Sequence, residues 1–193
     1  MIGSRNNKGI ALKTEFDDKP AARGRRLSAE DYSAGAVSLA PWFLGKILCR
    51  EREGVVARLR ITETEAYCGE TDSACHARFG KTERTKIMYR RGGFAYVYLC
   101  YGIHWLLNLV TGQEEFPEAV LIRGAGTWDG PGKLTKALNI DRGFNGEDLT
   151  VSKRLWLEDD GFRPLYQATP RIGVAYAAPE DRARLWRFKT CSD

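Results

Sequence analysis

The longest regular pattern in the sequence is an alternation of side chains from Val55 to Tyr67. One face of this segment carries Ala57, Leu59, Ile61, Glu63, Glu65 and Tyr67, and the other carries Arg58, Arg60, Thr62 and Thr64. A period of two is the period of a β-strand, in which successive side chains point to opposite faces. The segment therefore predicts a strand whose inward face is apolar at first and acidic towards its end.

A second constraint comes from two alternating segments, residues 94–100 and 104–110, which only Tyr101, Gly102 and Ile103 separate. Such close spacing around a glycine predicts a β-hairpin that turns near Gly102. We expect further strands at residues 120–123 and 171–175, and helical segments at residues 28–44 and 131–138. Because adjoining strands outnumber strand–helix–strand units, these elements predict an α+β fold, a single mixed domain around a largely antiparallel sheet with surrounding helices.

The chain has 193 residues, which is the length of one ordinary domain. Residues 1–26 have little periodic apolar content and predict a flexible basic arm, so that the domain would comprise residues 27–193. No apolar stretch approaches the roughly 20 residues that cross a bilayer, and the first residues lack the apolar part of a secretory signal. The five cysteines contain no C-x-x-C pair. We therefore expect a cytoplasmic protein with reduced thiols.

The positive charge is concentrated in two places. Residues 1–26 carry seven Lys and Arg against three acids, and residues 78–91 carry six against one. The rest of the chain then has 17 basic and 21 acidic residues, since the totals are 30 and 25. Such a distribution is typical of a surface that meets a polyanion such as nucleic acid, although a basic run can also be a solvated loop.

Among single residues, Glu65 and Tyr101 stand out. The strand pattern places Glu65 towards the interior, where burial would favour its protonated form and suit a general base that activates water. The alternative is a carboxylate that merely pairs with an arginine. Tyr101, at a hairpin tip after the basic segment, is placed to insert between bases. The two histidines, His76 and His104, match no metal-binding pattern, so we expect no metal site.

Several segments together resemble the alkyladenine (3-methyladenine) DNA glycosylases. They are E-T-E-A-Y at residues 63–67, V-Y-L-C-Y-G at 97–102, L-I-R-G-A-G at 121–126, G-P-G-K-L at 130–134 and R-I-G-V-A-Y-A at 171–177, and the similarity extends from about Leu27 to Phe188. The resemblance implies a single mixed domain around a curved antiparallel sheet, with a protruding β-hairpin that enters the DNA minor groove. It also implies base excision repair of duplex DNA that contains damaged purines.

The resemblance assigns the reaction to two residues. Glu65 would activate the water that displaces the base from C1′ of the deoxyribose, and Arg123 would help to hold that water. Tyr101 would take the place of the flipped nucleotide in the base stack. The product would be an abasic site, formed without a metal, a redox cofactor or an enzyme amine, so that no lyase step follows.

The base pocket that the resemblance implies has two walls. Tyr67 would stack on one side of the base, and His76 and Tyr98 would form the other. Asn108 matches an asparagine that crowds the 2-amino group of guanine. Phosphate contacts would come from the basic residues Arg78, Lys81, Arg84 and Lys86.

Two other functions are compatible with parts of the pattern. One is a noncatalytic nucleic-acid-binding module on the same fold, related to the C-terminal domain of formyltransferases, although such a module has no need for Glu65, Arg123 and Asn108. The other is a hydrolase of free nucleosides or RNA, although such an enzyme has no need for Tyr101. In the absence of an apolar heptad stripe, we expect a monomer.

Overall fold

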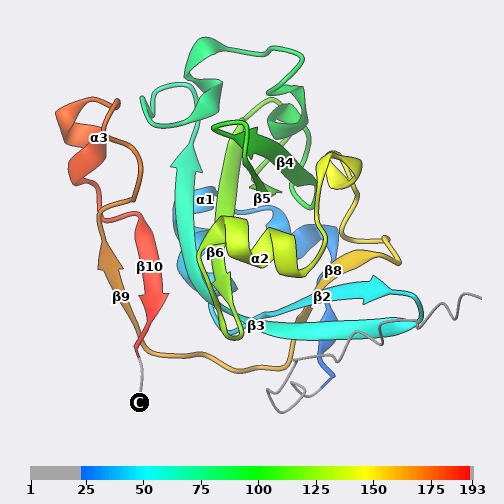
Figure 1. Cartoon of the computed structure of the whole chain (residues 1–193). Coiled ribbons are helices and arrows are strands. Elements are labelled where there is room, and N and C mark those ends of the chain that lie inside the picture. Colours follow the sequence, from blue (N-terminus) through cyan, green and yellow to red (C-terminus); the bar gives the residue numbers. More distant parts are fainter. Residues whose placement is uncertain (1–22, 192–193) are drawn as a thin grey trace, which may run out of the picture.

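An antiparallel sheet organises the computed structural model, which describes residues 23–191 (Figure 1). Within these residues the strands are β1 (Arg25–Arg26), β2 (Ile47–Arg52), β3 (Val55–Cys68), β4 (Ala95–Cys100), β5 (His104–Thr111), β6 (Glu118–Ala125), β7 (Trp128–Asp129), β8 (Leu155–Asp159), β9 (Tyr166–Thr169) and β10 (Arg187–Thr190). The α-helices are α1 (Ala36–Phe43), α2 (Pro131–Ala137) and α3 (Pro179–Ala183). Short 3-10 helices lie at Ala29–Tyr32, His76–Phe79, Lys86–Tyr89 and Arg142–Phe144. The predicted α+β fold is confirmed.

The long strand β3 connects the two halves of the sheet, whose order is β1-β8-β2-β3-β6-β5-β4. Its first half pairs with β2, and its second half pairs with β6 on one edge and with β10 on the other. The register with β6 shifts between Ile61 and Thr64. Because a bulge bends a strand and increases its twist, this irregularity curves the sheet just before Glu65.

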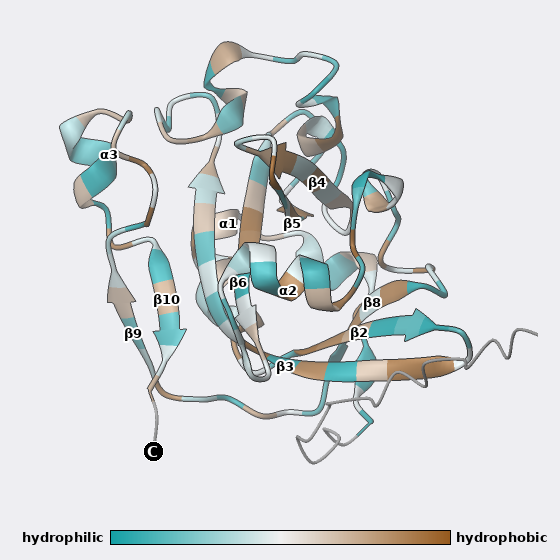
Figure 2. Cartoon of the chain, viewed as in Figure 1, coloured by the Kyte–Doolittle hydropathy of each residue, from teal (hydrophilic) through white to brown (hydrophobic). Residues whose placement is uncertain are grey.

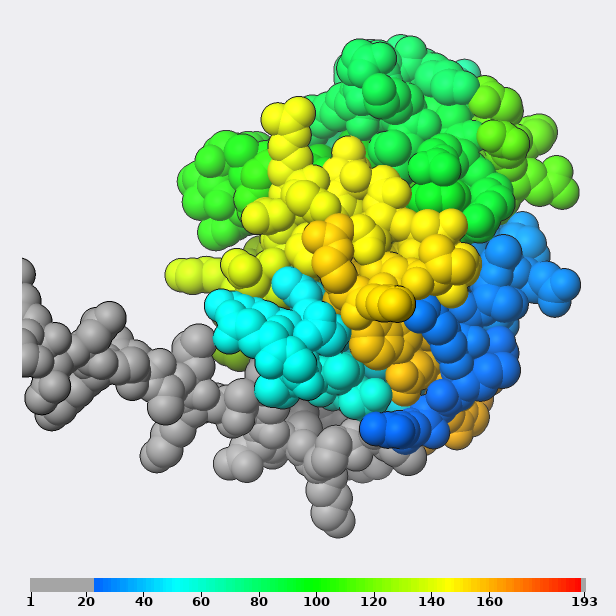
Figure 3. Space-filling model, turned by 90° about the vertical axis from the view of Figure 1, so that its right-hand side faces the viewer, coloured from blue at the N-terminus to red at the C-terminus, as the bar shows by residue number. Residues whose placement is uncertain are grey.

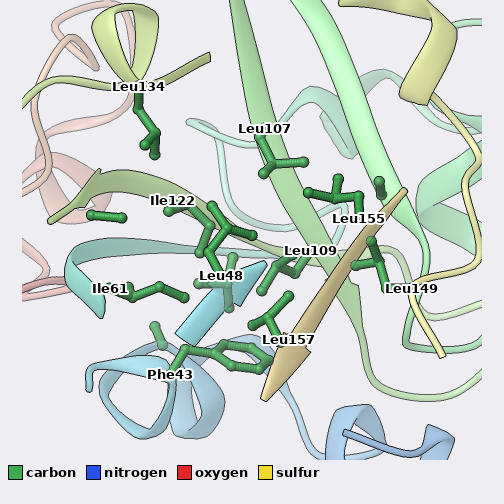
Figure 4. Packing of buried hydrophobic residues seen from close by; sticks show 14 of the residues in the cluster. Phe43, Leu48, Ile61, Leu107, Leu109, Ile122, Leu134, Leu149, Leu155 and Leu157 are labelled. Carbon is green, nitrogen blue, oxygen red and sulfur yellow. The ribbon is translucent and has the colours of Figure 1, made fainter. Parts of the chain in front are cut away.

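The main hydrophobic core lies between the sheet, α1 and α2. Its side chains come from segments between Leu27 and Phe188 that are far apart in the sequence, and they converge on one another (Figure 4). The labelled members are Phe43, Leu48, Ile61, Leu107, Leu109, Ile122, Leu134, Leu149, Leu155 and Leu157. Helix α1 continues through Pro41, and Thr64 of β3 donates a hydrogen bond of 2.8 Å from its hydroxyl to the Ala40 carbonyl.

The alternation along β4 separates two hydrophobic clusters. Ala95 and Val97 belong to the main core, whereas Tyr96 packs in a second cluster with Met88, Tyr89 and the partly buried Tyr98. Hydropathy colouring shows apolar residues concentrated on β4 and β8, and apolar and polar residues alternating along the first half of β3 (Figure 2). The two faces of β4 are therefore both covered. The main core covers the face with Ala95 and Val97, and the second cluster covers the face with Tyr96 and Tyr98.

The predicted hairpin is present as β4 and β5. Tyr101 and Gly102 occupy its turn with positive φ angles of 50° and 71°, and Tyr101 is 86% exposed. The chain around residue 100 projects from the molecule at the left of the space-filling view (Figure 3). The tip is therefore available to a partner.

Two predictions about chain segments need revision or lie outside the described residues. The prediction of a strand at residues 171–175 is wrong, because this segment forms a loop. Its Ile172 N–H donates to the Glu65 carboxylate instead of to a neighbouring strand. Of the predicted arm, residues 1–22 lie outside the described residues, and Arg25–Arg26 pair with β8. No helix within residues 23–191 is long and apolar enough to cross a membrane.

Truncation of a core side chain should destabilise the domain. Leu107 is fully buried on β5, so Leu107→Ala should lower the free energy of unfolding by about 2–5 kcal/mol. Ile103, which is 72% exposed in the same hairpin, provides the control, and Ile103→Ala should change it by less than about 0.5 kcal/mol. Urea unfolding measures both, and equal effects would contradict the description of the core.

Candidate active site

The site is centred on the Glu65 carboxylate, which has no exposed surface. Its Oε1 accepts a hydrogen bond of 2.8 Å from the Ile172 N–H and lies 3.4 Å from Nη1 of Arg123. Its Oε2 accepts a hydrogen bond of 2.9 Å from the Tyr67 hydroxyl. Burial raises the pKa of the Glu65 carboxyl, whereas the Arg123 charge and the two donors act in the opposite direction. A carboxylate held in this way can take up a proton near neutral pH more readily than an exposed one.

Arg123 lies between two carboxylates. Its Nε donates a hydrogen bond of 2.8 Å to Oε1 of Glu63, while Nη1 faces Glu65. Glu63 is also paired with Arg187 at 2.9 Å. Glu63 thus fixes the orientation of the guanidinium that reaches Glu65, a contribution that the sequence pattern did not distinguish from an ordinary ion pair.

A cavity of about 820 Å³ lies beside these residues. Tyr67, Arg123 and Ile172 line it, while Glu65 lies directly behind them. This volume falls in the range of small-molecule sites, about 300–1,000 Å³. A carboxylate oxygen can accept about two hydrogen bonds, and Oε2 of Glu65 accepts one, so a water that entered past Tyr67 would find a free acceptor position.

The residues predicted to form the base pocket line this same cavity. Tyr67 lies on β3, while His76 and Tyr98 pack edge to face with ring centroids 4.5 Å apart. The His76 Nδ1 lies 3.0 Å from the Tyr96 hydroxyl. Asn108 is buried on β5 and donates a hydrogen bond of 3.1 Å from Nδ2 to the Tyr96 carbonyl. The structure thus brings Tyr67, His76, Tyr98 and Asn108 together around one cavity.

The exposed Tyr101 also lines the cavity, together with other residues at its mouth. Tyr98 and Tyr101 belong to the same hairpin, in which Tyr96 is directly opposite Asn108 and Tyr98 is opposite Leu106. One hairpin therefore carries both the projecting tip and part of the pocket wall.

Comparison with known proteins gives the family. Residues 30–192 match the family model described as methylpurine-DNA glycosylase (MPG). The chain is 47% identical over 164 residues to a protein of Psychrobacter cryohalolentis, covering 69% of this chain and 77% of that protein. It is 40% identical over 187 residues to a protein of Natranaerobius thermophilus, covering 84% and 94%. Each of the two is named "Putative 3-methyladenine DNA glycosylase".

The chain belongs to the methylpurine-DNA glycosylase family. A protein of Sodalis glossinidius with the same name is 44% identical over 172 residues, which cover 85% of this chain and 96% of that protein. The family resemblance predicted from the sequence is confirmed, and the family and the names of the relatives indicate a DNA glycosylase, a hydrolase acting in DNA repair.

The four basic residues predicted to contact phosphates fall into two groups in this glycosylase-family chain. Lys81 pairs with Glu115 at 2.6 Å and Lys86 pairs with Glu83 at 2.7 Å, both on the surface. Arg78 and Arg84 line the cavity instead, and neither has a carboxylate partner within residues 23–191. The Arg84 guanidinium lies 5.3 Å from the Tyr98 ring centroid. Two of the four predicted phosphate contacts are thus unneutralised at the site itself.

A buried ion pair that the sequence pattern did not reveal supports the site from behind. Arg171 donates two hydrogen bonds to the Asp72 carboxylate, of 2.6 and 2.8 Å, and a third of 2.9 Å to the Ala66 carbonyl on β3. Its guanidinium also lies 4.9 Å from the Tyr67 ring centroid. Since Ile172 follows directly, this pair holds the Ile172 N–H against Glu65 and backs the Tyr67 ring.

Within residues 23–191, no group of three or more His, Cys, Asp or Glu side chains is arranged to hold a metal ion.

His76 should be neutral at physiological pH. Burial, followed by the charges of Arg84 and Arg78, lowers its pKa from 6.5 to about 4. Because the folded pKa is depressed, the unfolded chain takes up the proton first, and the His76 contribution should make the protein less stable as pH falls from about 6.5 towards 4. An NMR titration of the imidazole carbon-bound protons measures the pKa directly, and His104→Gln leaves His76 as the single histidine. A His76 pKa near 6.5 would show that the ring is solvated.

Proposed function

We propose that this protein is a monofunctional DNA glycosylase that removes alkylated purines such as 3-methyladenine from duplex DNA by hydrolysis. The same pocket would also accept deaminated and etheno purines. The observation that supports this proposal most directly is the Glu65 carboxylate, which is buried beside a cavity and held between Arg123, the Ile172 N–H and the Tyr67 hydroxyl. The proposal assigns the reaction to residues 27–193 acting as a monomer in the cytoplasm, with Glu65 as the general base.

With alkylated purines the reaction needs little from the enzyme at the leaving group. A 3- or 7-alkylated purine carries a positive charge, and its departure as a neutral base relieves that charge. Glu65 would take a proton from water as the water oxygen bonds to C1′ and the bond from C1′ to the base nitrogen breaks. Arg123 would orient that water together with the carboxylate. The products are a free base and an abasic site, and both electrons of the broken bond leave with the base.

Selection of the base would use the pocket walls. Stacking between Tyr67 and the His76–Tyr98 pair suits a flat, electron-poor ring, because cations are attracted to aromatic faces. Neutral His76 adds no charge to oppose a cationic base. Asn108, fixed by its hydrogen bond to the Tyr96 carbonyl, would crowd the 2-amino group of guanine. Flipping costs least for damaged and weakly paired bases, which adds to selectivity.

Removal of the carboxylate charge should abolish base release. Glu65→Gln should lower the single-turnover rate on a duplex with one ethenoadenine or hypoxanthine, or on methylated DNA, by about 10²–10⁴-fold. Duplex binding should persist, and alkali-labile abasic sites provide the measurement. The matched control is Glu158→Gln, which alters another buried carboxylate. Glu158 lies on β8 and pairs with Arg58 of β3, and its replacement should leave the rate unchanged.

For the wild type, the rate should rise with pH through a value above the ordinary 4.5 of a glutamate, since burial raises the pKa of Glu65 and the ionised form is the base. Release that Glu65→Gln leaves intact would exclude Glu65 as the base. No release from any damaged duplex would favour a binding module. Borohydride should trap no protein–DNA adduct if the reaction is purely hydrolytic.

Loss of the hairpin tip side chain should weaken action on paired DNA. Tyr101→Ala should reduce lesion-duplex affinity by about 5- to 100-fold, because the gap left by an everted nucleotide would lose its stacking partner. The same variant should act almost normally on a single-stranded lesion, where no stack has to be refilled. If Tyr101→Ala and the wild type release the base at equal rates from the duplex and from the single-stranded lesion, the tip has no such role.

A further inference from the structure

Three side chains at the mouth of the cavity form a stack that the reaction itself does not use. The guanidinium carbon of Arg78 lies 4.2 Å from the Phe79 ring centroid and 4.9 Å from the Tyr176 ring centroid. All three line the cavity, yet Phe79 is 74% exposed and Tyr176 is 57% exposed. We refer to Arg78, Phe79 and Tyr176 as the rim stack.

The rim stack is built from two distant segments that are fixed by backbone contacts. Arg78 and Phe79 belong to the 3-10 helix His76–Phe79, and Arg78 Nη1 donates a hydrogen bond of 3.1 Å to the Cys75 carbonyl. Tyr176 lies in the loop before α3 and donates a hydrogen bond of 2.8 Å from its hydroxyl to the Ala74 carbonyl. The loop before α3 and the segment after β3 lie at the same end of the molecule (Figure 1). The arrangement is therefore preformed.

The charge of the rim stack is available to a ligand. Within residues 23–191 Arg78 has no carboxylate partner, unlike the surface residues Lys81 and Lys86. The field of Arg78 and Arg84 extends into the cavity, where it contributes to the low pKa of His76. An exposed aromatic ring with an unneutralised guanidinium on one face suits a nucleotide, which offers a base for stacking and a phosphate for the cation.

We propose that the rim stack binds a nucleotide next to the everted one, with its base on Phe79 and its phosphate at Arg78. The inference rests on the proposed function. Phe79 and Tyr101 are both exposed and both line the same cavity, so DNA that delivers a base through the mouth contacts both. DNA is thus held at two aromatic positions, one refilling the stack and one fixing a neighbouring nucleotide.

Replacement of the exposed ring tests the proposal in the full-length protein. The probe is a duplex with one tetrahydrofuran abasic analogue, which has no base to release, so that affinity is measured without turnover. Stacking of a base on an aromatic side chain strengthens binding by about 5- to 150-fold. Phe79→Ala should therefore weaken binding at least fivefold, whereas Phe79→Tyr should remain within about twofold of the wild type.

Phe116→Ala provides the matched control. Phe116 is a similarly exposed phenylalanine, 64% accessible, that lies beside the acidic residues Glu70 and Glu115. The chain near residue 115 projects on the side of Figure 3 opposite to the chain near residue 100. Its replacement should leave binding unchanged.

Arg78→Gln tests the phosphate contact separately. The slope of log affinity against log salt concentration should become shallower by about one, because one fewer phosphate is neutralised. An unchanged slope would remove Arg78 from the proposal. A loss below fivefold in Phe79→Ala would overturn the stacking site, provided that the wild type prefers the tetrahydrofuran duplex to undamaged DNA. Absence of that preference in the wild type would count against the proposed function itself.

Discussion

The burial of the Glu65 carboxylate is the constraint on which the site depends. A buried carboxylate without partners would give up its charge, because transfer from water to the protein interior strongly favours the neutral acid. Arg123, the Ile172 N–H and the Tyr67 hydroxyl supply the compensation here. These groups come from β6, from the loop after β9 and from β3 itself. The carboxylate can keep its charge only when the fold brings those segments together.

The surrounding architecture serves this requirement at two levels. The bulge in β3 curves the sheet before Glu65, and pairing of β3 with β6 places Leu121 opposite Glu65, two residues before Arg123. Glu63 then fixes one end of the Arg123 guanidinium. Behind the cavity, the buried pair of Arg171 and Asp72 holds the loop that supplies the Ile172 N–H. Breaking such a pair leaves an uncompensated buried charge, so the loop and the site are stabilised together.

The sequence predicted the local elements better than their partners. The period of two located β3 and the β4–β5 hairpin, because alternation reflects two faces that meet different surroundings. It also located Glu65 and Tyr101, and the family motifs brought in Arg123, Asn108 and the remaining pocket residues. The run at residues 171–175 was misinterpreted as a strand. It is a loop in which Val174 is buried, Ile172 is half exposed, and the Ile172 N–H donates to the Glu65 side chain instead of to a neighbouring strand. Local pattern could not reveal that Arg171 pairs with Asp72, 99 residues away. The sequence could not predict the rim stack for the same reason, because Tyr176 is far from Arg78 in the sequence.

The β4–β5 hairpin carries both the exposed tip and part of the pocket wall, so its length sets the distance between them. Tyr101 lies three positions after Tyr98 and is the first residue beyond β4, so at about 3.4 Å per residue the Cα atoms of the two are at most roughly 10 Å apart. Within the proposed function, this span fixes how far a nucleotide travels from its stack to the aromatic wall. A slip of β4 by one residue against β5 would turn Tyr96 and Tyr98 away from the pocket, because such a slip exchanges the two faces of a strand. The pocket therefore depends on the register of this hairpin as well as on the side chains that the hairpin carries.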